Sequence, residues 1–255
     1  MFQGFNLKLG VSNGFEQYQT AGLTRFNQEK KLWGQRLEKY THNGVINASK
    51  LQDAWFAQQH AEVFISHSHT DISLAASLAA WLESNFGVRS FIDSTVWGHA
   101  SDLQKQLDDA YTKKTAGNYD YDASNRACAH VHMMLCGALS SMLNQTECVI
   151  FLNTPSSIVA EDTIKDQSGS LTASPWIYFE LITTKFIEKK FPRPILESLS
   201  MEKSFEKAAS GKPLNIVHKA EIEHLIDLNI NDLAKWEKCG KKTTGALDYL
   251  YAMKF

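Results

Sequence analysis

The 255-residue chain is 44% apolar and 21% charged, which is the composition of an ordinary soluble globular protein. Its formal net charge of −2 creates no overall positive field, so composition does not favour nucleic acid or anionic lipid as a partner. No apolar stretch approaches the roughly 20 residues of a membrane-spanning helix, and the segment MFQGFNLKLG lacks the pattern of a secretory signal. We therefore expect a cytoplasmic protein with no membrane or nucleic-acid partner.

The four cysteines agree with that expectation. Cys128, Cys136, Cys148 and Cys239 form no C-x-x-C pair, and three of them fall inside apolar patterns. This arrangement is more typical of buried free thiols than of disulfides or zinc ligands.

Residues 1–60 are expected to form a helical N-terminal extension. Two helices are predicted there, Asn27–Tyr40 and Ser49–His60, and the second has Asn47 or Ser49 as its N-cap.

A strand–helix–strand unit follows the extension. The short apolar run Val63–Ile65 is typical of a buried parallel strand. Asp71 is a plausible N-cap, residues 75–86 carry apolar side chains at helical spacing, and Gly87 stands where a C-cap glycine belongs. Val88–Ile92 is the second strand, so this unit predicts a parallel sheet with a right-handed crossover.

The alternation of strands and helices continues, with one interruption. A loop is predicted over 93–101, a helix over 102–111 and a strand at Cys148–Leu152. Between them, the segment 112–147 has a loop-like first part and a helical stripe over 126–143, so it is an insertion in the minimal pattern.

Beyond the third strand we expect a polar loop and then a helix from Pro175 to about Lys189. Arg193–Leu196 and Leu214–Val217 are candidate fourth and fifth strands. The sequence therefore predicts an α/β fold, a flavodoxin-like doubly wound parallel sheet over 61–220. Residues 221–255 are expected to be a helical segment that packs on this core.

The polar motif FISHSHTD lies at the carboxyl end of the first predicted strand, where open parallel sheets bind ligands. His67, His69 and Asp71 could face one metal ion, and the H-x-H-x-D pattern resembles the zinc motif of metallo-β-lactamase-fold hydrolases. That motif continues with a histidine, whereas position 72 is isoleucine here, and its fold begins with antiparallel strands rather than helices. A metal-dependent hydrolase is kept as an alternative.

The second polar motif, SPWIYFEL, starts a helix. Ser174 is a good N-cap, and Pro175 occupies the first helical position, which needs no amide donor. Trp176 and Glu180 are four residues apart, so indole and carboxylate share one face of the helix. Cleaving the bond between nicotinamide and ribose develops positive charge on the sugar, which a fixed carboxylate stabilises.

The two motifs together resemble the TIR (Toll/interleukin-1 receptor) domain family. Its first strand box is matched by VFISHSHTD, its helix and second strand by LAASLAAWL and SFID, and its W-x-x-x-E helix by SPWIYFEL. The resemblance covers roughly residues 61–200. The added termini are similar to stand-alone bacterial TIR proteins of antiphage defence, which process NAD.

The resemblance implies a site. Glu180 matches the catalytic glutamate of the NAD-hydrolysing members, and Trp176 matches their aromatic residue four positions earlier. His67 and His69 match residues that line the nucleotide pocket, and Ser68, Asp93 and Trp97 complete the predicted substrate-binding set. Segment 93–101 would be the loop through which TIR domains often self-associate.

The implied activity is that of an NAD nucleosidase or cyclase, with NAD as substrate and no separate cofactor or bound metal. Its product, ADP-ribose or a cyclic isomer, would be a signal for a separate effector, or the enzyme would deplete NAD. A non-enzymatic TIR interaction module is the main alternative. The insertion at 112–147 departs from the family pattern, as does the lack of an arginine near His69, where phosphate binding is then in doubt.

Overall fold

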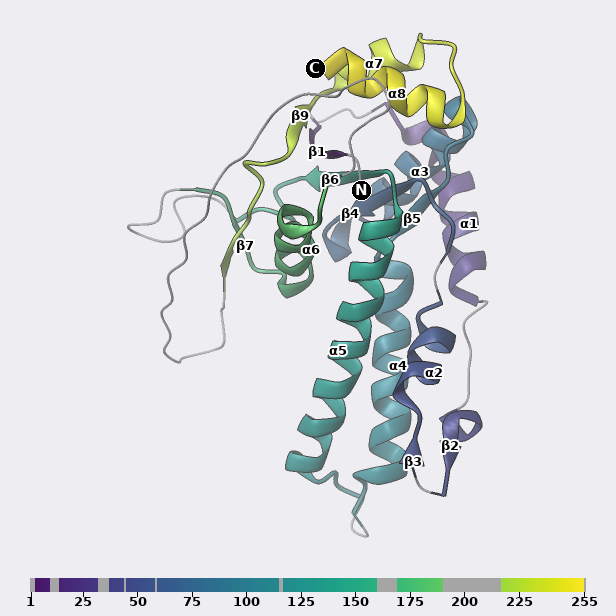
Figure 1. Cartoon of the computed structure of the whole chain (residues 1–255), viewed down its shortest axis with the longest axis vertical. Helices are drawn as coiled ribbons and strands as arrows, with labels where there is room; N and C mark the ends of the chain where they lie inside the picture. The colour runs from purple at the N-terminus through teal and green to yellow at the C-terminus, as the bar shows by residue number, and fades with distance from the viewer. Residues whose placement is uncertain are drawn as a thin grey trace.

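The computed structural model describes residues 3–9, 14–31, 37–43, 45–57, 59–114, 117–159, 169–189 and 217–254, apart from the side chains at 30, 31, 97 and 98. It is an α/β protein with a central five-stranded sheet between two layers of helices (Figure 1). The strands in spatial order are β5 (Ser90–Ile92), β4 (Val63–Ser66), β6 (Cys148–Asn153), β1 (Gln3–Lys8) and β9 (Ile226–Leu228). All four pairings are parallel, which confirms the predicted flavodoxin-like, doubly wound class.

The alternation of side chains along the strands separates the two helical layers. Val63 and Ile65 of β4 contact the layer of α1 (Gln19–Lys31), α3 (Ile72–Phe86), α7 (Ile230–Glu237) and α8 (Thr243–Lys254). Phe64 faces the opposite layer, which contains α2 (Ala48–Trp55), α4 (Ser94–Tyr111), α5 (Tyr121–Gln145) and α6 (Pro175–Phe186). Because both faces of the sheet are covered, its strands β4 and β6 are apolar in nearly every position.

Short elements complete the described chain. They are η1 (Glu16–Tyr18), η2 (Leu37–Tyr40), η3 (His69–Asp71), the hairpin of β2 (Thr41–His42) and β3 (Val45–Ile46), and the pair β7 (Leu171–Thr172) and β8 (His218–Lys219). No helix among the described residues is long and apolar enough to cross a membrane.

The sheet extends beyond the range expected from the sequence, because β1 and β9 come from the segments assigned to the helical ends. The expectation of a purely helical region 1–60 is therefore wrong for Gln3–Lys8, which lies between β6 and β9. Its Phe5 and Leu7 are fully buried, but Asn6 between them is polar, so the segment lacks the continuous apolar run of β4.

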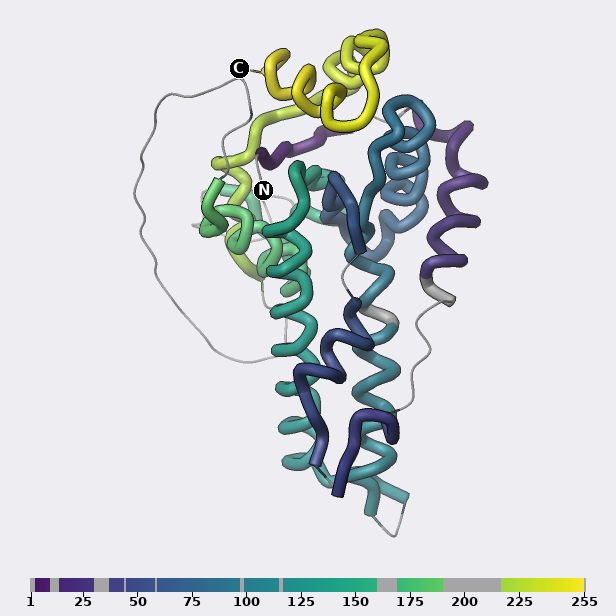
Figure 2. Tube along the Cα trace, turned by 45° about the vertical axis from the view of Figure 1, so that its right-hand side comes forward, coloured from purple at the N-terminus to yellow at the C-terminus, as the bar shows by residue number. Residues whose placement is uncertain are grey.

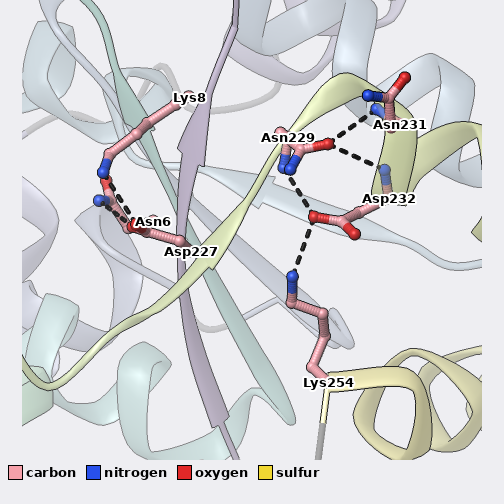
Figure 3. A network of polar contacts seen from close by, with 7 residues as sticks. All are labelled: Asn6, Lys8, Asp227, Asn229, Asn231, Asp232 and Lys254. Carbon is pink, nitrogen blue, oxygen red and sulfur yellow. Dashed lines mark hydrogen bonds and ion pairs between the residues drawn. The ribbon is translucent and has the colours of Figure 1, made fainter.

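Polar contacts at the carboxyl ends of β1, β6 and β9 hold these strands together (Figure 3). The carboxylate of Asp227 accepts a hydrogen bond from Asn6 at 2.8 Å and pairs with Lys8 at 2.9 Å. Asn153 in turn donates to Asn6 at 3.0 Å. The buried Asn6 side chain is therefore satisfied on both sides, as a polar group in a central strand must be.

The C-terminal segment packs on the sheet as expected, although it contributes β9 as well as helices. Asn229 caps α7 by accepting from the amide of Asp232, whose carboxylate accepts from the Asn229 amide and pairs with Lys254 of α8 (Figure 3). Trp236 and Tyr251 are buried in the core between these helices and the sheet.

The insertion at 112–147 forms α5, which pairs with α4 in a long helical hairpin. Helix α4 begins directly after β5, so residues 94–101 are helical where a loop was expected, and α5 starts at Tyr121 rather than Arg126. Asp120 accepts from the amide of Ala123 at 2.9 Å and so caps α5. The two helices run side by side away from the sheet, with α2 and β3 beside them (Figures 1 and 2).

Other local predictions have mixed outcomes. Asn47 caps α2 through the amide of Lys50, and Gly87 ends α3 in the left-handed conformation, as expected. The first predicted helix, over 27–40, is displaced: α1 occupies Gln19–Lys31. The candidate strands at 193–196 and 214–217 lie outside the described residues, except for position 217, which is not in a strand.

Candidate functional site

The start of α6 has the predicted local structure. Ser174 accepts a hydrogen bond from the amide of Ile177 at 3.3 Å, and Pro175 is the first helical residue. This cap fixes the first turn and the helix face that carries Trp176 and Glu180. Glu180 is only 1% exposed, whereas Trp176 is partly buried against α4 and α5.

The Glu180 carboxyl group lies at the carboxyl edge of the sheet, between β4 and β5. Ser66, the last residue of β4, donates a hydrogen bond from Oγ to Glu180 Oε2 at 2.6 Å. The carboxyl group of Asp93, which follows β5, is hydrogen-bonded to that of Glu180. Three segments of the chain therefore meet in one cluster, which we call the Glu180 cluster: Ser66, His67, Asp93, Ser94 and Glu180.

His67 closes the cluster on the other side of Asp93. Its Nδ1 atom lies 2.7 Å from Asp93 Oδ1, and its Nε2 atom lies 3.0 Å from the Ser94 hydroxyl. Burial lowers the pKa of His67 to about 4, although the nearby Glu180 acts in the opposite direction. The imidazole is thus neutral at pH 7, and its contact with Asp93 is a hydrogen-bonding contact rather than an ion pair.

The carboxyl pair holds a proton at neutral pH. Burial is the main cause that raises the pKa of Glu180, and repulsion from Asp93 adds to it. Burial likewise raises the pKa of Asp93. Two carboxyl groups in hydrogen-bond contact away from water cannot both ionise, so they share at least one proton. Buried acids with shifted pKa values beside a sheet edge are typical of functional sites.

A cavity of about 280 Å³ adjoins the other end of the same helix face. Trp176 lines it together with Ser101 and Gln104 of α4 and His132 and Leu135 of α5. The rings of His132 and Trp176 meet edge to face, with centroids 5.4 Å apart. Trp176 therefore marks an open space, whereas Glu180, one helical turn further along α6, is covered.

The structure brings together some of the predicted site residues and separates others. His67, Asp93 and Glu180 are in contact within one cluster. Ser68 is only partly buried and bonds to Thr70 at 3.1 Å, and His69 is exposed on η3, so neither is buried with the cluster. Trp97 lies within α4, and its side chain is outside the described part of the molecule.

The expected self-association loop at 93–101 is not a surface loop. Asp93 caps α4 by accepting from the Ser94 amide at 2.6 Å, and Thr95 and Val96 in its first turn are buried. This segment therefore packs inside the molecule, because a helix that follows β5 directly must cover the sheet.

The residues of the H-x-H-x-D pattern do not converge on one point. His67 is buried against Asp93, His69 is exposed, and Asp71 accepts from the Thr154 hydroxyl at 2.6 Å. Asp71 stands at the N-cap position of α3, but its side chain accepts a hydrogen bond from Thr154 and makes no cap hydrogen bond to the helix. In the part of the chain that the structure describes, no group of three His, Cys, Asp or Glu side chains could hold a metal ion.

Sequence reasoning missed Ser66 and Ser94 as partners of the predicted residues, and it missed Ser101 and Gln104 around Trp176. Ser66 carries a local signal, since it is the one polar residue of β4. The other contacts join α4, α5 and α6, and nothing in the spacing of those segments indicates that they meet. No family model, no curated protein and no solved structure matches the chain.

Proposed function

We propose that the chain is a TIR-type enzyme that cleaves the bond between nicotinamide and ribose in NAD, with Glu180 as the catalytic carboxylate. The observation that carries the proposal is the position of Glu180 at the carboxyl edge of the sheet, in hydrogen-bond contact with Asp93 and Ser66. In open parallel sheets this edge is where ligands bind, and a carboxyl group held neutral there has no evident structural purpose.

The cavity beside Trp176 would receive the nicotinamide end of the substrate. At about 280 Å³ it is below the roughly 300–1,000 Å³ of sites that enclose a whole ligand of that size, so the rest of NAD would lie outside it. The indole would pack against the ring. Because Glu180 is covered, binding must loosen the contact of α6 with α4 and α5 so that the carboxyl group meets the ribose.

Charge explains how a protonated glutamate would become active. The nicotinamide ring of NAD is cationic, and a cation beside Asp93 and Glu180 lowers the pKa of the pair and releases the shared proton. As the glycosidic bond breaks, its electron pair leaves with neutral nicotinamide, and the positive charge that develops on the ribose is stabilised by the Glu180 carboxylate. Water then adds to the ribose carbon, or a group of the same molecule adds to it in a cyclase.

The proposal extends to the setting that the TIR resemblance implies. An ADP-ribose-type product would signal to a separate effector in bacterial antiphage defence, or the enzyme would deplete NAD. A cytoplasmic location belongs to the same proposal, and the four cysteines support it because all are free thiols, as in a reducing compartment.

The test is to incubate concentrated protein with NAD, with and without EDTA and with a crowding agent, and to follow NAD and its products by mass spectrometry. Glu180→Gln should slow NAD loss by at least about 100-fold, the scale of a lost transition-state charge. It should still fold, because glutamine resembles the protonated acid. Glu188→Gln is the matched control, since Glu188 is exposed just beyond α6.

Each alternative has its own outcome in this experiment. Equal NAD loss by wild type and Glu180→Gln would remove Glu180 from the mechanism. Inhibition by EDTA would favour a metal-dependent hydrolase. Intact NAD with crowding agent, together with unchanged self-assembly of Glu180→Gln, would favour the non-enzymatic interaction module.

A further inference from the structure

A second and larger cavity lies on the α4–α5 hairpin, away from the Glu180 cluster. Its volume is about 570 Å³, and it is bounded by α2, β3, α4 and α5. These elements stand beside one another below the sheet in both views of the chain (Figures 1 and 2). The volume is within the range of small-molecule sites in proteins.

The wall of the hairpin cavity is apolar. Its main lining residues are Val45, Ile46, Leu51, Leu107, Ala127 and Met134. Val45 is 71% exposed, although a β-branched apolar side chain at the rim of a cavity is normally covered. Small alanines of α5 face the larger side chains of α2, α4 and β3, which leaves the space open rather than filled.

The cavity has two basic lining residues, which lie together, besides the hydroxyl groups of Tyr111 and Thr112. Arg126 and His130 are one turn apart on α5, both exposed and both lining the cavity. No ion pair joins Arg126 to another described residue, and Asp120, which is close enough to feel its charge, pairs with Lys114 at 3.0 Å. None of the described lining residues is acidic.

The surroundings of the cavity are also compatible with a negative group. A neighbouring hollow shares Val45 and Ile46 with it and is lined by Lys39 and Lys50. On the opposite side, near Tyr111, the carboxylate of Asp109 already accepts from Tyr119 at 2.8 Å and lies 3.6 Å from Lys113. Acidic residues stand nearby as well: Asp108 accepts a hydrogen bond from Thr112 at 3.1 Å, and Glu38 lines the hollow near Tyr111. The charged lining of the cavity itself is basic.

We propose that the hairpin cavity binds a small carboxylate-headed amphiphile, with its aliphatic body among the apolar residues and its carboxylate on Arg126. The planar guanidinium binds a carboxylate through two parallel hydrogen bonds and keeps its charge at any physiological pH. His130 supplies a further donor beside it. This site is separate from Glu180 and does not depend on cleavage of NAD.

The test is calorimetric titration of the full chain with decanoate, below its micelle concentration. Decanoate should bind to one site per chain, and decyltrimethylammonium, with the same aliphatic body and the opposite charge, should not. Arg126→Gln should weaken decanoate binding by about tenfold or more, because a charge-assisted contact is lost. Lys105→Gln is the matched control: it removes one positive charge from an exposed position on the same hairpin, outside the cavity lining.

A second variant tests the apolar part of the site. Ala127→Trp would fill the cavity and should abolish decanoate binding, with circular dichroism as the check that α5 is retained. If this variant does not fold, Arg126→Gln decides, since Arg126 is exposed and forms no ion pair with another described residue. Absence of decanoate binding to the wild type, equal binding of the cationic analogue, or unchanged binding by Arg126→Gln would each overturn the proposal.

Discussion

The Glu180 cluster and the α4–α5 hairpin differ in which side chains they bury and which they expose. At the sheet edge, polar and acidic groups are buried in contact with one another, as with Ser66, Asp93 and Glu180. Beside the hairpin, apolar side chains such as Val45 of β3 remain exposed around an open cavity. Both arrangements cost stability, because a buried acid loses its hydration and an open apolar wall lacks packing contacts. Function, rather than folding, is the usual reason to keep such features.

Packing density separates the two regions most strongly, and two glycines test it. A methyl group at Gly22 of α1 would overlap the backbone carbonyl of Ala76 in α3, whereas one at Gly137 of α5 would be 3.4 Å from the flexible amide of Gln52. Gly22→Ala should lower the free energy of unfolding by about 3 kcal/mol, since a packed backbone cannot yield. Gly137→Ala should raise it by up to about 1 kcal/mol through helix propensity.

Urea unfolding of the two variants provides the measurement. Equal effects at the two glycines would contradict the distinction between a close-packed sheet layer and a loosely packed hairpin.

The pH dependence of stability should come from the sheet region and not from the hairpin. The folded-state pKa of His67 is about 4, below the usual value of 6.5, because of its burial. The unfolded chain therefore binds a proton that the folded His67 does not, so His67 by itself makes stability fall by up to about 3 kcal/mol as the pH drops from about 6.5 to 4. The raised pKa values of Asp93 and Glu180 act with the opposite sign over the same range, because the folded chain holds a proton there that the unfolded chain releases. Burial also lowers the pKa of His224, beside Thr184, to about 4 and adds to the loss.

Urea unfolding at several pH values between 7 and 4 measures this slope. His67→Asn should remove the contribution of His67, so that stability falls less on acidification than in the wild type, and Arg126→Gln on the hairpin is the control that should leave the slope unchanged. A slope that persists at full size in His67→Asn would mean that His67 is not the buried neutral imidazole described above.

The smallest effects distinguish a buried hydroxyl from an exposed methyl group. Ser66→Ala removes the donor to Glu180 and should cost about 1–3 kcal/mol, the range for a buried acceptor left without its partner. Val45→Thr on the hairpin, at a 71% exposed position, should change stability by less than about 0.5 kcal/mol. Thermal unfolding of both variants measures the two changes in stability. Similar losses of stability for Ser66→Ala and Val45→Thr would contradict the expected difference between a buried and an exposed side chain.

The fold was predictable where the signal is local. The apolar run at Val63–Ile65, the glycine at position 87 and the Ser174–Pro175 cap each specify one element through steric and hydrogen-bonding preferences of a few neighbouring residues. The prediction failed at β1 and at the start of α4. In β1 the buried Asn6 breaks the apolar pattern. Its side chain donates a hydrogen bond to Asp227, which lies more than 200 residues away in the chain.

The first turns of α4 show the same limit. The sequence STVWGHAS contains a glycine and β-branched residues, which are poor helix formers, so a loop was the better local prediction. Packing overrides that preference, because Val96 and Ala100 are buried against α2 and α5. Local propensity differs by fractions of a kcal/mol per residue, which is less than burial of one apolar side chain provides.

By itself, the sequence determined the parallel α/β class, the cap of α6 and the shared helix face of Trp176 and Glu180. Only the tertiary structure decided that Glu180 meets Ser66 and Asp93, that His69 stays outside, and that the insertion carries an open apolar cavity. The physical reason is the distance along the chain over which each kind of interaction acts. Periodicity and capping act within a few residues, whereas hydrogen bonds and burial at the sheet edge join residues as far apart as Ser66 and Glu180, whose separation in the chain is 114 residues.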